Sequence, residues 1–580
     1  MTDTIPTLGR VTDKPIGPYE SQPAPFEEWD PRTVEVARRV AELVNSRRPD
    51  LAVDHIGSSA VPGLPGKNVV DVGIEADPQD IPQVARLLCD LGFEMTTGPR
   101  AFPPTRPLLI GSLEQDGRRF RIHAHVHPRE HRVYGREHAR DIAFRDALRA
   151  DPVLRDEYAA RKNAIISSGT KGSIRYSMAK TEWIRGALQR IGVADPPISP
   201  PATIGILGGG QLGRMLALAA RELGFRIAVL DPDRDSPAAA VADGIVPGRY
   251  DDTEAALRLA NDADVITYEL EHVSLDLVQR LDWDWPVRPG VIALFTTQDR
   301  IEERRCLEAE GASVAQWRKV GDVDDLRAAA GELGLPLRLK AGRGGYDGRS
   351  QVRIVSEEDV DDALDRLRRP SDEIALAERE VEFEAELSVI CARGVDGRAV
   401  TFPLARNRHD AGILIESVTP AGVPAEVEER ADRLVRQLAE GLDLVGTLTA
   451  ELFLLPGGEL LVNELAPRVH NSGHWSIEGT ITSQFEQHVR AITGLPLGPT
   501  TLRAGAAATV NLLGTGRERE ARPAGVDRAL READVHVHLY DKRRVFERRK
   551  MGHVTAVAAT PEEALAKARA AAAKIEWEDR

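Results

Sequence analysis

Cysteines, long apolar runs and excess positive charge are scarce in this 580-residue chain. Its three cysteines, Cys89, Cys306 and Cys391, lie far apart, which excludes a disulfide framework or a cysteine-rich metal site and fits a reducing compartment. No stretch approaches the roughly 20 apolar residues of a membrane span. Residues 1–10 have neither a basic start nor an apolar core, so no secretory signal is expected. These absences predict a cytoplasmic protein with no membrane partner.

The charge balance argues against a nucleic-acid partner. Lys and Arg total 76 against 91 Asp and Glu, which gives a formal net charge of −15, whereas nucleic-acid-binding domains are typically basic. With 42% hydrophobic and 29% charged residues, the composition is that of a globular protein. At about 150 residues per domain, the length predicts roughly three or four domains.

A proline-rich segment divides the chain into two halves. Residues 193–202 contain four prolines and no apolar period, so they are predicted to form a semi-rigid linker. Residues 1–17, rich in Pro, Thr and Gly, are predicted to be a flexible tail. Alternating strand and helix patterns in residues 18–192 predict an α/β domain, and the same alternation continues after the linker. The fold class is therefore multidomain α/β.

A glycine-rich segment opens the second half. Gly208-Gly209-Gly210-Gln211-Leu212-Gly213 follows an apolar strand and starts a helix, and Asp231 closes the next strand. This spacing is that of a dinucleotide fingerprint, in which glycines let backbone amides approach a phosphate. A nicotinamide site, a general phosphate or nucleotide cradle, and glycines that only tighten a turn all remain open on these residues alone.

Two later segments have the composition of a nucleotide site. Lys340 ends an apolar stretch and precedes the glycine-rich residues 342–349, which suit a lid that closes over a phosphate. An exposed hairpin is the alternative. The acids Glu378, Glu380 and Glu386 follow, and acids at a strand end accept hydrogen bonds from ribose or adenine or are simply solvated. These segments alone leave both interpretations open.

Glu451 and Glu464 flank the hairpin signal at 456–458, so we expect them side by side on adjacent antiparallel strands. Paired carboxylates hold Mg²⁺ together with a polyphosphate, and Asn463 would add an oxygen. Two exposed acids that repel each other are the alternative. Residues 463–475, NELAPRVHNSGHW, concentrate further polar groups directly after an apolar strand, which favours a site.

The order of these motifs resembles the 5-(carboxyamino)imidazole ribonucleotide synthase family of ATP-grasp enzymes over about residues 203–560. The segments that carry the likeness are GILGGGQLGRM, QDR, GGYDGR, ELAPRVHNSGHW and RRKMGH. The resemblance implies a Rossmann-like pre-ATP-grasp domain at 203–297, an ATP-grasp domain at 298–500 and a small β-rich lobe at 501–580. It further implies a homodimer that uses ATP, Mg²⁺ and bicarbonate to carboxylate 5-aminoimidazole ribonucleotide, releasing ADP and phosphate.

The resemblance also assigns residues to ligands. ATP is expected to meet Arg300, Lys340, Gly345, Tyr346, Asp347, Gly348, Arg349, Ser350, Gln351, Glu378, Arg379, Glu380, Val381, Glu386, His409, Asn463 and Glu464. Mg²⁺ is expected at Glu451 and Glu464. The ribonucleotide is expected near Gly210, Gln211, Leu212, Glu271, Tyr346, Arg468, Lys542 and Arg549. For catalysis we expect Arg349, His470 and Asn471 to hold the bicarbonate-derived group and Asp347 to remove the amine proton.

Four positions depart from the family pattern. Gly342 stands where the lid often has a basic residue, Ser350 where it often has glycine, and Arg406 where an acid is customary, while Arg338 interrupts an apolar strand. These differences bear on the lid and on ATP affinity. Another ATP-grasp ligase or formate-using transformylase, and a nucleotide sensor without turnover, are the alternatives; a nicotinamide dehydrogenase would leave the carboxylate pair unexplained.

The first half resembles the GrpB-like family, which has a nucleotidyltransferase fold, over about residues 18–191. IGSSAVPGL at 56–64 followed by VVD at 69–71 carries the likeness. Gly73 stands where a second strand acid is usual, with Glu75 further along the same face. His123, His125 and His127 alternate on one strand face and with Asp71 are a candidate metal or phosphate site; a polar strand face is the alternative. Nucleotidyl transfer, nucleotide sensing and a structural role all stay open.

Overall fold

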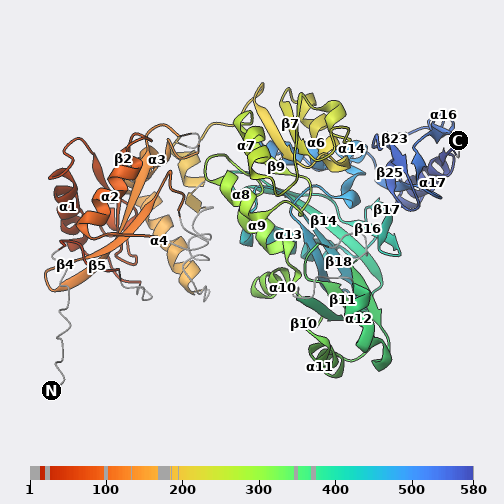
Figure 1. Ribbon diagram of the computed structural model, residues 1–580, viewed down its shortest axis with the longest axis horizontal. Helices are drawn as coiled ribbons and strands as arrows, with labels where there is room; N and C mark the ends of the chain where they lie inside the picture. Colours follow the sequence, from red (N-terminus) through yellow and green to blue (C-terminus); the bar gives the residue numbers. More distant parts are fainter. Residues whose placement is uncertain are drawn as a thin grey trace, which may run out of the picture. The chain divides into compact units, whose positions relative to one another are not determined.

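The computed structural model describes most of the chain (Figure 1). The described residues are 14–19, 26–96, 102–131, 133–167, 183–184, 186–193, 195–344, 350–367 and 374–578. The chain divides into two compact units, Met1–Asp195 and Pro196–Arg580, and this boundary falls inside the proline-rich segment. Within the described ranges, no helix combines the length and apolar character that crossing a membrane requires.

The first unit is built on a five-stranded sheet in the order β1-β2-β5-β4-β3, in which β2 and β5 are parallel and the other neighbours antiparallel. Helices α1 and α2 pack together on one face, and α3 lies over the other (Figure 1). The strands are β1 (Val53–Ile56), β2 (Val70–Ala76), β3 (Glu94–Met95), β4 (Leu108–Gln115) and β5 (Arg118–Pro128). The helices are α1 (Arg32–Asn45), α2 (Ile81–Leu91), α3 (Glu137–Ala150) and α4 (Pro152–Ser167), and the short turn η1 spans Ser58–Ala60.

Alternation along β2 and β5 gives this sheet one apolar and one polar face. The even-numbered residues of β2 from Val70 to Ala76, and of β5 from Phe120 to Val126, are buried in the core beneath α1 and α2. The odd-numbered residues point the other way and include Asp71, Glu75 and all three histidines of β5. The polar face is therefore set by the strand period.

Residues 14–17, which the sequence assigns to a flexible tail, are bound to this sheet. Ile16 is buried and its N–H donates to the carbonyl of Leu91, while Gly17 exchanges two hydrogen bonds with Ser112. The tail prediction is wrong for these residues because one apolar side chain enters the core. Residues 1–13 lie outside the described ranges.

The second unit begins with a parallel four-stranded sheet in the order β8-β7-β6-β9. Its helix α6 starts at Gln211, directly after the glycine-rich segment, as the sequence predicts. The strands are β6 (Thr203–Leu207), β7 (Arg226–Asp231), β8 (Gly244–Pro247) and β9 (Val265–Tyr268), and the helices are α6 (Gln211–Glu222), α7 (Thr253–Asn261), α8 (Leu275–Asp282) and α9 (Val291–Gln298).

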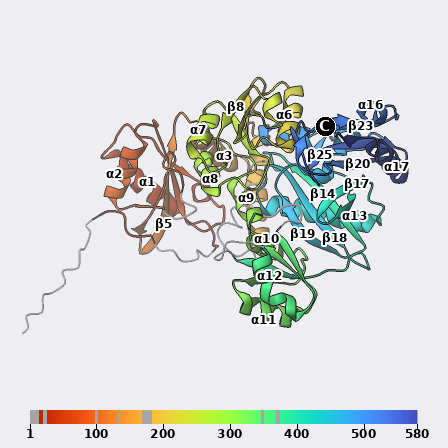
Figure 2. The ribbon, with the colours of Figure 1, turned by 45° about the vertical axis from the view of Figure 1, so that its right-hand side comes forward.

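An antiparallel four-stranded sheet follows in the order β10-β13-β11-β12, and α11 and α12 pack against it (Figure 2). Helix α10 (Arg300–Ala309) precedes it and begins at an Asp299 cap that accepts two backbone N–H groups. The other elements are β10 (Trp317–Val320), α11 (Val323–Leu333), β11 (Leu337–Ala341), β12 (Gln351–Ile354), α12 (Val360–Leu367) and β13 (Ala375–Arg379).

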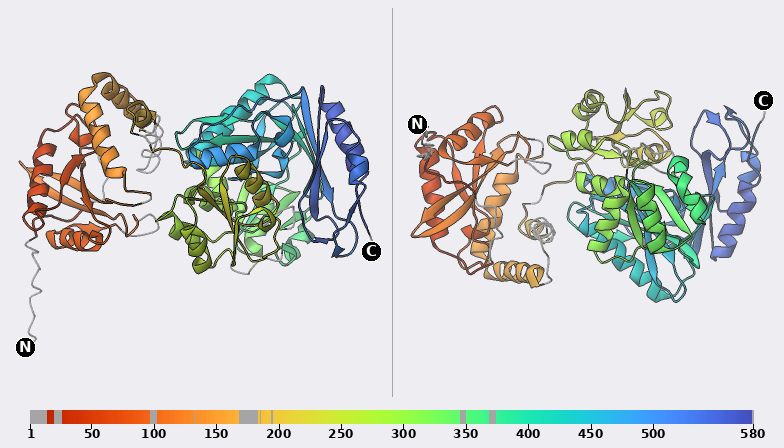
Figure 3. Two further views of the ribbon diagram at one scale, coloured as in Figure 1. Left: turned by 90° about the horizontal axis from the view of Figure 1, so that it is seen from above. Right: turned by 60° about the horizontal axis from the view of Figure 1, so that its bottom comes forward.

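A nine-stranded sheet completes the second unit, with the order β19-β18-β14-β16-β17-β20-β25-β23 and β15 beside β14. The strands after residue 505 are continuous with the earlier strands of this sheet, because β20 pairs with β17. Helix α17 lies along β20 and β25 (Figure 3). The strands are β14 (Ala385–Arg393), β15 (Ala399–Thr401), β16 (Ala405–Asp410), β17 (Ile413–Thr419), β18 (Gly446–Leu454), β19 (Leu460–Ala466), β20 (Ala506–Leu513), β23 (Val535–Leu539) and β25 (Lys550–Ala558). The helices are α13 (Ala425–Gly441), α14 (Ser476–Gly479), α15 (Gln484–Thr493), α16 (Val526–Ala529) and α17 (Pro561–Ala572).

Candidate active site

A cavity of about 600 Å³ lies between the antiparallel four-stranded sheet (β10-β13-β11-β12) and the nine-stranded sheet of the second unit. Its walls gather residues that are up to 250 positions apart in the sequence. Of the residues expected to bind ATP, Mg²⁺ or the bicarbonate-derived group, the lining includes Arg300, Lys340, Ser350, Gln351, Glu378, Arg379, Glu380, Val381, Glu386, His409, Glu451, Asn463, Glu464, His470 and Asn471.

Glu451 of β18 and Glu464 of β19 are direct cross-strand partners, as the hairpin signal predicts. The register then shifts by one residue, so that Leu452 pairs with Val462 and Asn463 is the extra residue of a bulge. Successive side chains of a regular strand point to opposite faces, and a bulge re-aims one of them. This bulge allows Asn463 and Glu464 to line the same cavity.

The carboxylate pair needs a compensating cation. Burial, followed by the charge of Glu464, raises the pKa of Glu451 to about 7. Two half-buried acids with the amide oxygen of Asn463 beside them offer the hard oxygen donors that Mg²⁺ prefers. The residues present therefore fit a magnesium ion.

A buried ionic network connects the lysine strand to this pair. Glu378 accepts from Arg304 Nε at 2.6 Å and lies 2.6 Å from Lys340 Nζ, which also donates to the Asn463 side chain at 3.3 Å. Burial alone would raise the pKa of Glu378, but Arg304 and Lys340 outweigh it and lower that pKa to about 2. The network fixes the Lys340 ammonium within the cavity wall.

The loop after β19 presents His470 and Asn471 to the cavity. Gln484 holds His470 through both backbone groups, accepting from its N–H at 2.9 Å and donating to its carbonyl at 2.7 Å. Burial and the nearby Arg468 cation lower the pKa of His470 well below its usual value, so the ring is neutral. Both polar atoms of the Asn471 amide are buried without a partner among the described residues. Such an amide is suited to a bound ligand.

Two of the family departures have clear partners. Arg338 donates to Glu380 at 2.6 and 2.9 Å, and Arg353 donates to the same carboxylate at 2.8 Å. Two arginines thus neutralise the Glu380 carboxylate. Arg406 donates to the carbonyl of Ala421 at 2.9 Å and is absent from the cavity lining.

The residues expected at the ribonucleotide form pairs that link separate elements. Gln211 accepts from Lys542 at 2.6 Å, and Lys542 also donates to the carbonyl of Lys550, a cavity residue. Arg468 lies 2.9 Å from Glu271. Arg549 stacks on Phe546 instead, and the partly buried Leu212 packs against the core of its own sheet.

The glycine-rich segment is bound by acids of its own unit. Asp231 accepts from the N–H of Gly209 and the hydroxyl of Tyr250, each at 2.7 Å. Glu269, which is buried, accepts from the N–H groups of Gly210 and Gly213 at the start of α6. The groups that a dinucleotide would use are therefore engaged within the protein, which favours a structural turn over a nicotinamide site.

Five expected residues, Gly345, Tyr346, Asp347, Gly348 and Arg349, lie outside the described residues. Conversely, sequence reasoning missed several residues of the lining, among them Arg304, Phe383, Phe453 and Lys550. Arg304 and Lys550 add positive charge, and Phe383 stacks on Phe453 with ring centres 4.6 Å apart. Arg304 had a signal because it follows Arg300 by one helical turn, and Lys550 lies within the RRKMGH segment.

In the first unit, the candidate cluster separates into two parts. Asp71 lies near His123 and His125, whereas His127 lies 3.4 Å from Glu137 of α3. Glu75, the possible substitute for a second strand acid, lies 3.3 Å from Arg129.

Four family models match successive parts of the chain. The GrpB protein model matches residues 24–190 and the ribonucleotide synthetase preATP-grasp domain residues 201–298. The ATP-grasp domain matches residues 305–485, and the phosphoribosylaminoimidazole carboxylase C-terminal domain residues 507–567. The last three together account for most of the second unit.

Individual relatives agree with these models. An N5-carboxyaminoimidazole ribonucleotide synthase of Bacillus subtilis is 43% identical over 359 residues, covering 62% of this chain and 92% of that protein. A crystal structure of an N5-carboxyaminoimidazole ribonucleotide synthetase with ADP is 42% identical with a TM-score of 0.60, covering 65% and 97% of the two chains. The Aspergillus clavatus enzyme, solved with ADP and 5-aminoimidazole ribonucleotide, is 32% identical with a TM-score of 0.59 and covers 64% and 98%.

Proposed function

Because the chain belongs, through its second unit, to the N5-carboxyaminoimidazole ribonucleotide synthase family, we propose that it carboxylates the exocyclic amine of 5-aminoimidazole ribonucleotide in purine biosynthesis. ATP and bicarbonate are the co-substrates, and the enzyme is a carbon–nitrogen ligase. The observation that carries this proposal is the cavity lined by a lysine network, a carboxylate pair and the buried Asn471 amide, which no described residue hydrogen-bonds.

The reaction requires an activated carbonate, since bicarbonate is a poor electrophile. Transfer of the γ-phosphoryl group of ATP to a bicarbonate oxygen gives carboxyphosphate and ADP. The amine then attacks the carbonyl carbon, inorganic phosphate leaves, and the amine proton passes to a base, for which we propose Asp347. One ATP is consumed for each carbon–nitrogen bond formed.

The described residues have distinct tasks in this scheme. Lys340, fixed by Glu378, offsets charge on the transferred phosphoryl group. Mg²⁺ held by Glu451 and Glu464 would neutralise the triphosphate. His470 is neutral, and the Asn471 amide has no hydrogen-bond partner among the described residues, so both suit hydrogen bonding to a carbonate-derived group without a competing charge. The stacked rings of Phe383 and Phe453 offer an apolar surface for the adenine ring of ATP.

Phosphate release tests this function. We expect ATP hydrolysis by the full chain to be stimulated by 5-aminoimidazole ribonucleotide when bicarbonate is present, with the carboxylated product detected from labelled bicarbonate. Turnover with formate in place of bicarbonate would favour the transformylase alternative. ATP binding with no phosphate release under any condition would favour a sensor.

Arg349 gives a residue-level test. Replacing Arg349 with Ala should abolish product formation, since a planar guanidinium matches the oxygens of the carbonate group. The matched control is Arg343→Ala, which removes a 62% exposed arginine paired with Asp299 and should change turnover by less than about threefold. Undiminished product with Arg349→Ala would refute the assignment.

A homodimer in the cytoplasm is also part of the proposal. It rests on the family likeness and on the composition of the chain. Light scattering on the purified full chain would measure the mass, and a monomer at micromolar concentration would contradict the dimer.

A further inference from the structure

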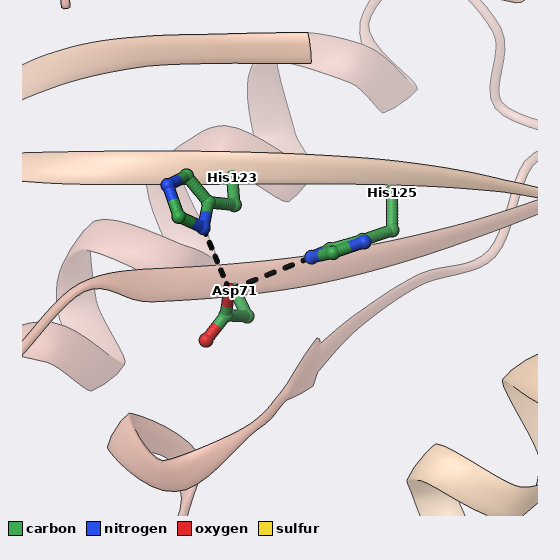
Figure 4. Close-up of side chains that lie close together, drawn as sticks. All are labelled: Asp71, His123 and His125. Atoms are coloured by element: carbon green, nitrogen blue, oxygen red, sulfur yellow. Dashed lines mark hydrogen bonds and ion pairs between the residues drawn. The ribbon is translucent and has the colours of Figure 1, made fainter. Parts of the chain in front are cut away.

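The polar face of the first unit brings together three potential metal ligands (Figure 4). In the parallel register of β2 and β5, Asp71 pairs with His123 and Gly73 with His125. Asp71 Oδ1 lies 3.2 Å from His123 Nδ1 and 3.5 Å from His125 Nε2. One ligand atom from each residue lies within 4.8 Å of the other two.

These separations suit coordination of one ion. Donor atoms held at about 2.0–2.1 Å from a zinc-like ion are about 3.0–3.4 Å apart, depending on the polyhedron. The two measured oxygen–nitrogen distances are close to that range. Small side-chain rotations would therefore bring all three donors onto a single ion.

Asp71, His123 and His125 supply one carboxylate and two imidazoles, so this cluster is not a magnesium site made of carboxylates. A side chain at Gly73 would bring its Cβ within 2.6 Å of His138 Nδ1, and His138 is itself bonded to Asp54 at 3.1 Å. A second acid on β2 next to Asp71 therefore has no room. One carboxylate and two imidazoles is a combination that transition metals take and that Mg²⁺ disfavours.

The surroundings hold the histidines in place. His123 Nε2 lies 3.1 Å from the hydroxyl of Tyr19, so its other nitrogen can face the carboxylate, as is usual for metal-bound histidine. His125 Nδ1 is buried and has no hydrogen-bond partner among the described residues. His127 is 1% exposed and faces Glu137, so it is not available to the same ion.

We propose that Asp71, His123 and His125 bind one divalent first-row transition metal ion, with the remaining coordination positions left to water. Three protein ligands are the usual number at a metal site that keeps an open position. The site differs in chemistry from the oxygen-only pair Glu451 and Glu464, and no step of the ribonucleotide reaction depends on it.

The test uses the full chain carrying Glu451→Gln and Glu464→Gln, so that the proposed magnesium pair cannot contribute. After chelation and dialysis, Zn²⁺ and Co²⁺ are titrated by calorimetry, and zinc-edge X-ray absorption reports the ligand types. We expect one ion per chain with two imidazole ligands, a loss of Zn²⁺ affinity of more than about 100-fold in Asp71→Asn and His125→Asn, and about tenfold in Tyr19→Phe.

Two controls separate this site from other histidines. His127→Asn removes the third histidine of the same strand, and His536→Asn removes an exposed histidine of β23; each should change Zn²⁺ affinity by less than about threefold. Circular dichroism confirms folding of every variant, and Tyr19→Phe keeps the test informative if a ligand variant fails to fold. The proposal is overturned if folded Asp71→Asn and His125→Asn bind Zn²⁺ as the parent does, or if the parent binds no Zn²⁺ or Co²⁺.

Discussion

Arg304 joins groups that the sequence identifies only separately. Its guanidinium, 2% exposed, donates to Glu378 at 2.6 Å, to Glu303 at 3.0 Å and to the carbonyl of Asn463 at 2.6 Å. It therefore connects helix α10 to one strand from each sheet beside the cavity. A charged residue on a charged helix gives no sequence signal of burial, because only the tertiary fold shows which of its arginines turns inward.

Replacing Arg304 with Met should destabilise the second unit markedly. Removing one partner of a buried ionic network leaves Glu378 and Glu303 without their shared cation, which typically costs about 3–5 kcal/mol. The control is Arg305→Met, since Arg305 is 55% exposed and lies 2.6 Å from Glu302 on the same helix, and it should cost less than about 1 kcal/mol. Urea unfolding of both variants measures the difference, and equal midpoints would contradict the role of Arg304.

The pH dependence of stability should reveal Glu378. Its folded-state pKa of about 2 lies below the usual 4.5, so its ionised form stabilises the fold above pH 4.5, and that contribution is lost as the pH falls toward 2. Glu378→Gln should therefore lower the urea midpoint strongly at pH 7 and less at pH 3.5. Glu332→Gln removes an exposed partner of Arg318; Arg318 lowers the pKa of Glu332 too, but solvent screens this pair, so the dependence should be much weaker. If Glu378→Gln lowered the urea midpoint by the same amount at both pH values, this assignment would be contradicted.

At the scale of elements, the alternation of residues along strands and the residues typical of turns predicted most of the strand and helix positions. The hairpin signal between β18 and β19 predicted the pairing of Glu451 with Glu464, and helix α6 begins at the glycine-rich segment as expected. The bulge at Asn463 could not be predicted from the sequence, because a one-residue register shift depends on the residues that pack against both strands. The same holds for Asp231, whose spacing matches a cofactor fingerprint although its carboxylate binds the protein's own loop.

The loop that carries His470 and Asn471 should tolerate no added bulk at Gly473. A Cβ there would lie 2.3 Å from Ile390 Cδ1 and 2.8 Å from Gln484 Cδ, and Gln484 is the residue that holds His470. Gly473→Ala should therefore reduce kcat/KM by about 10–100-fold through misplaced ligands. Steady-state kinetics would measure this effect.

The matched control for that loop is Gly331→Ala. Gly331 lies in helix α11, where an added Cβ meets nothing within 4 Å, and alanine is the better helix former by about 1 kcal/mol. Activity should be unchanged and stability the same or higher. If the two variants had equal activity, tight packing at Gly473 would not position His470.

At the scale of the whole molecule, the second unit contains every described residue of the cavity. Its nine-stranded sheet runs without interruption from the carboxylate hairpin to β23, and Lys542 donates to Gln211 at the start of helix α6. The sequence predicted a separate C-terminal lobe, and only strand pairing reveals that β20 continues the ATP-grasp sheet through β17. Pairings between strands about 90 residues apart leave no local pattern to read.

The second unit should therefore work without the first. Residues 196–580 have their own core clusters and include all three matched synthase domains, so this fragment should fold and keep substrate-stimulated ATP hydrolysis within about twofold of the full chain. Circular dichroism and phosphate release on both proteins measure this, with the folded Glu464→Gln fragment as the inactive control. A folded fragment with at least tenfold lower turnover would mean that the GrpB-like unit takes part in the reaction. The second unit alone would then not be sufficient for full activity.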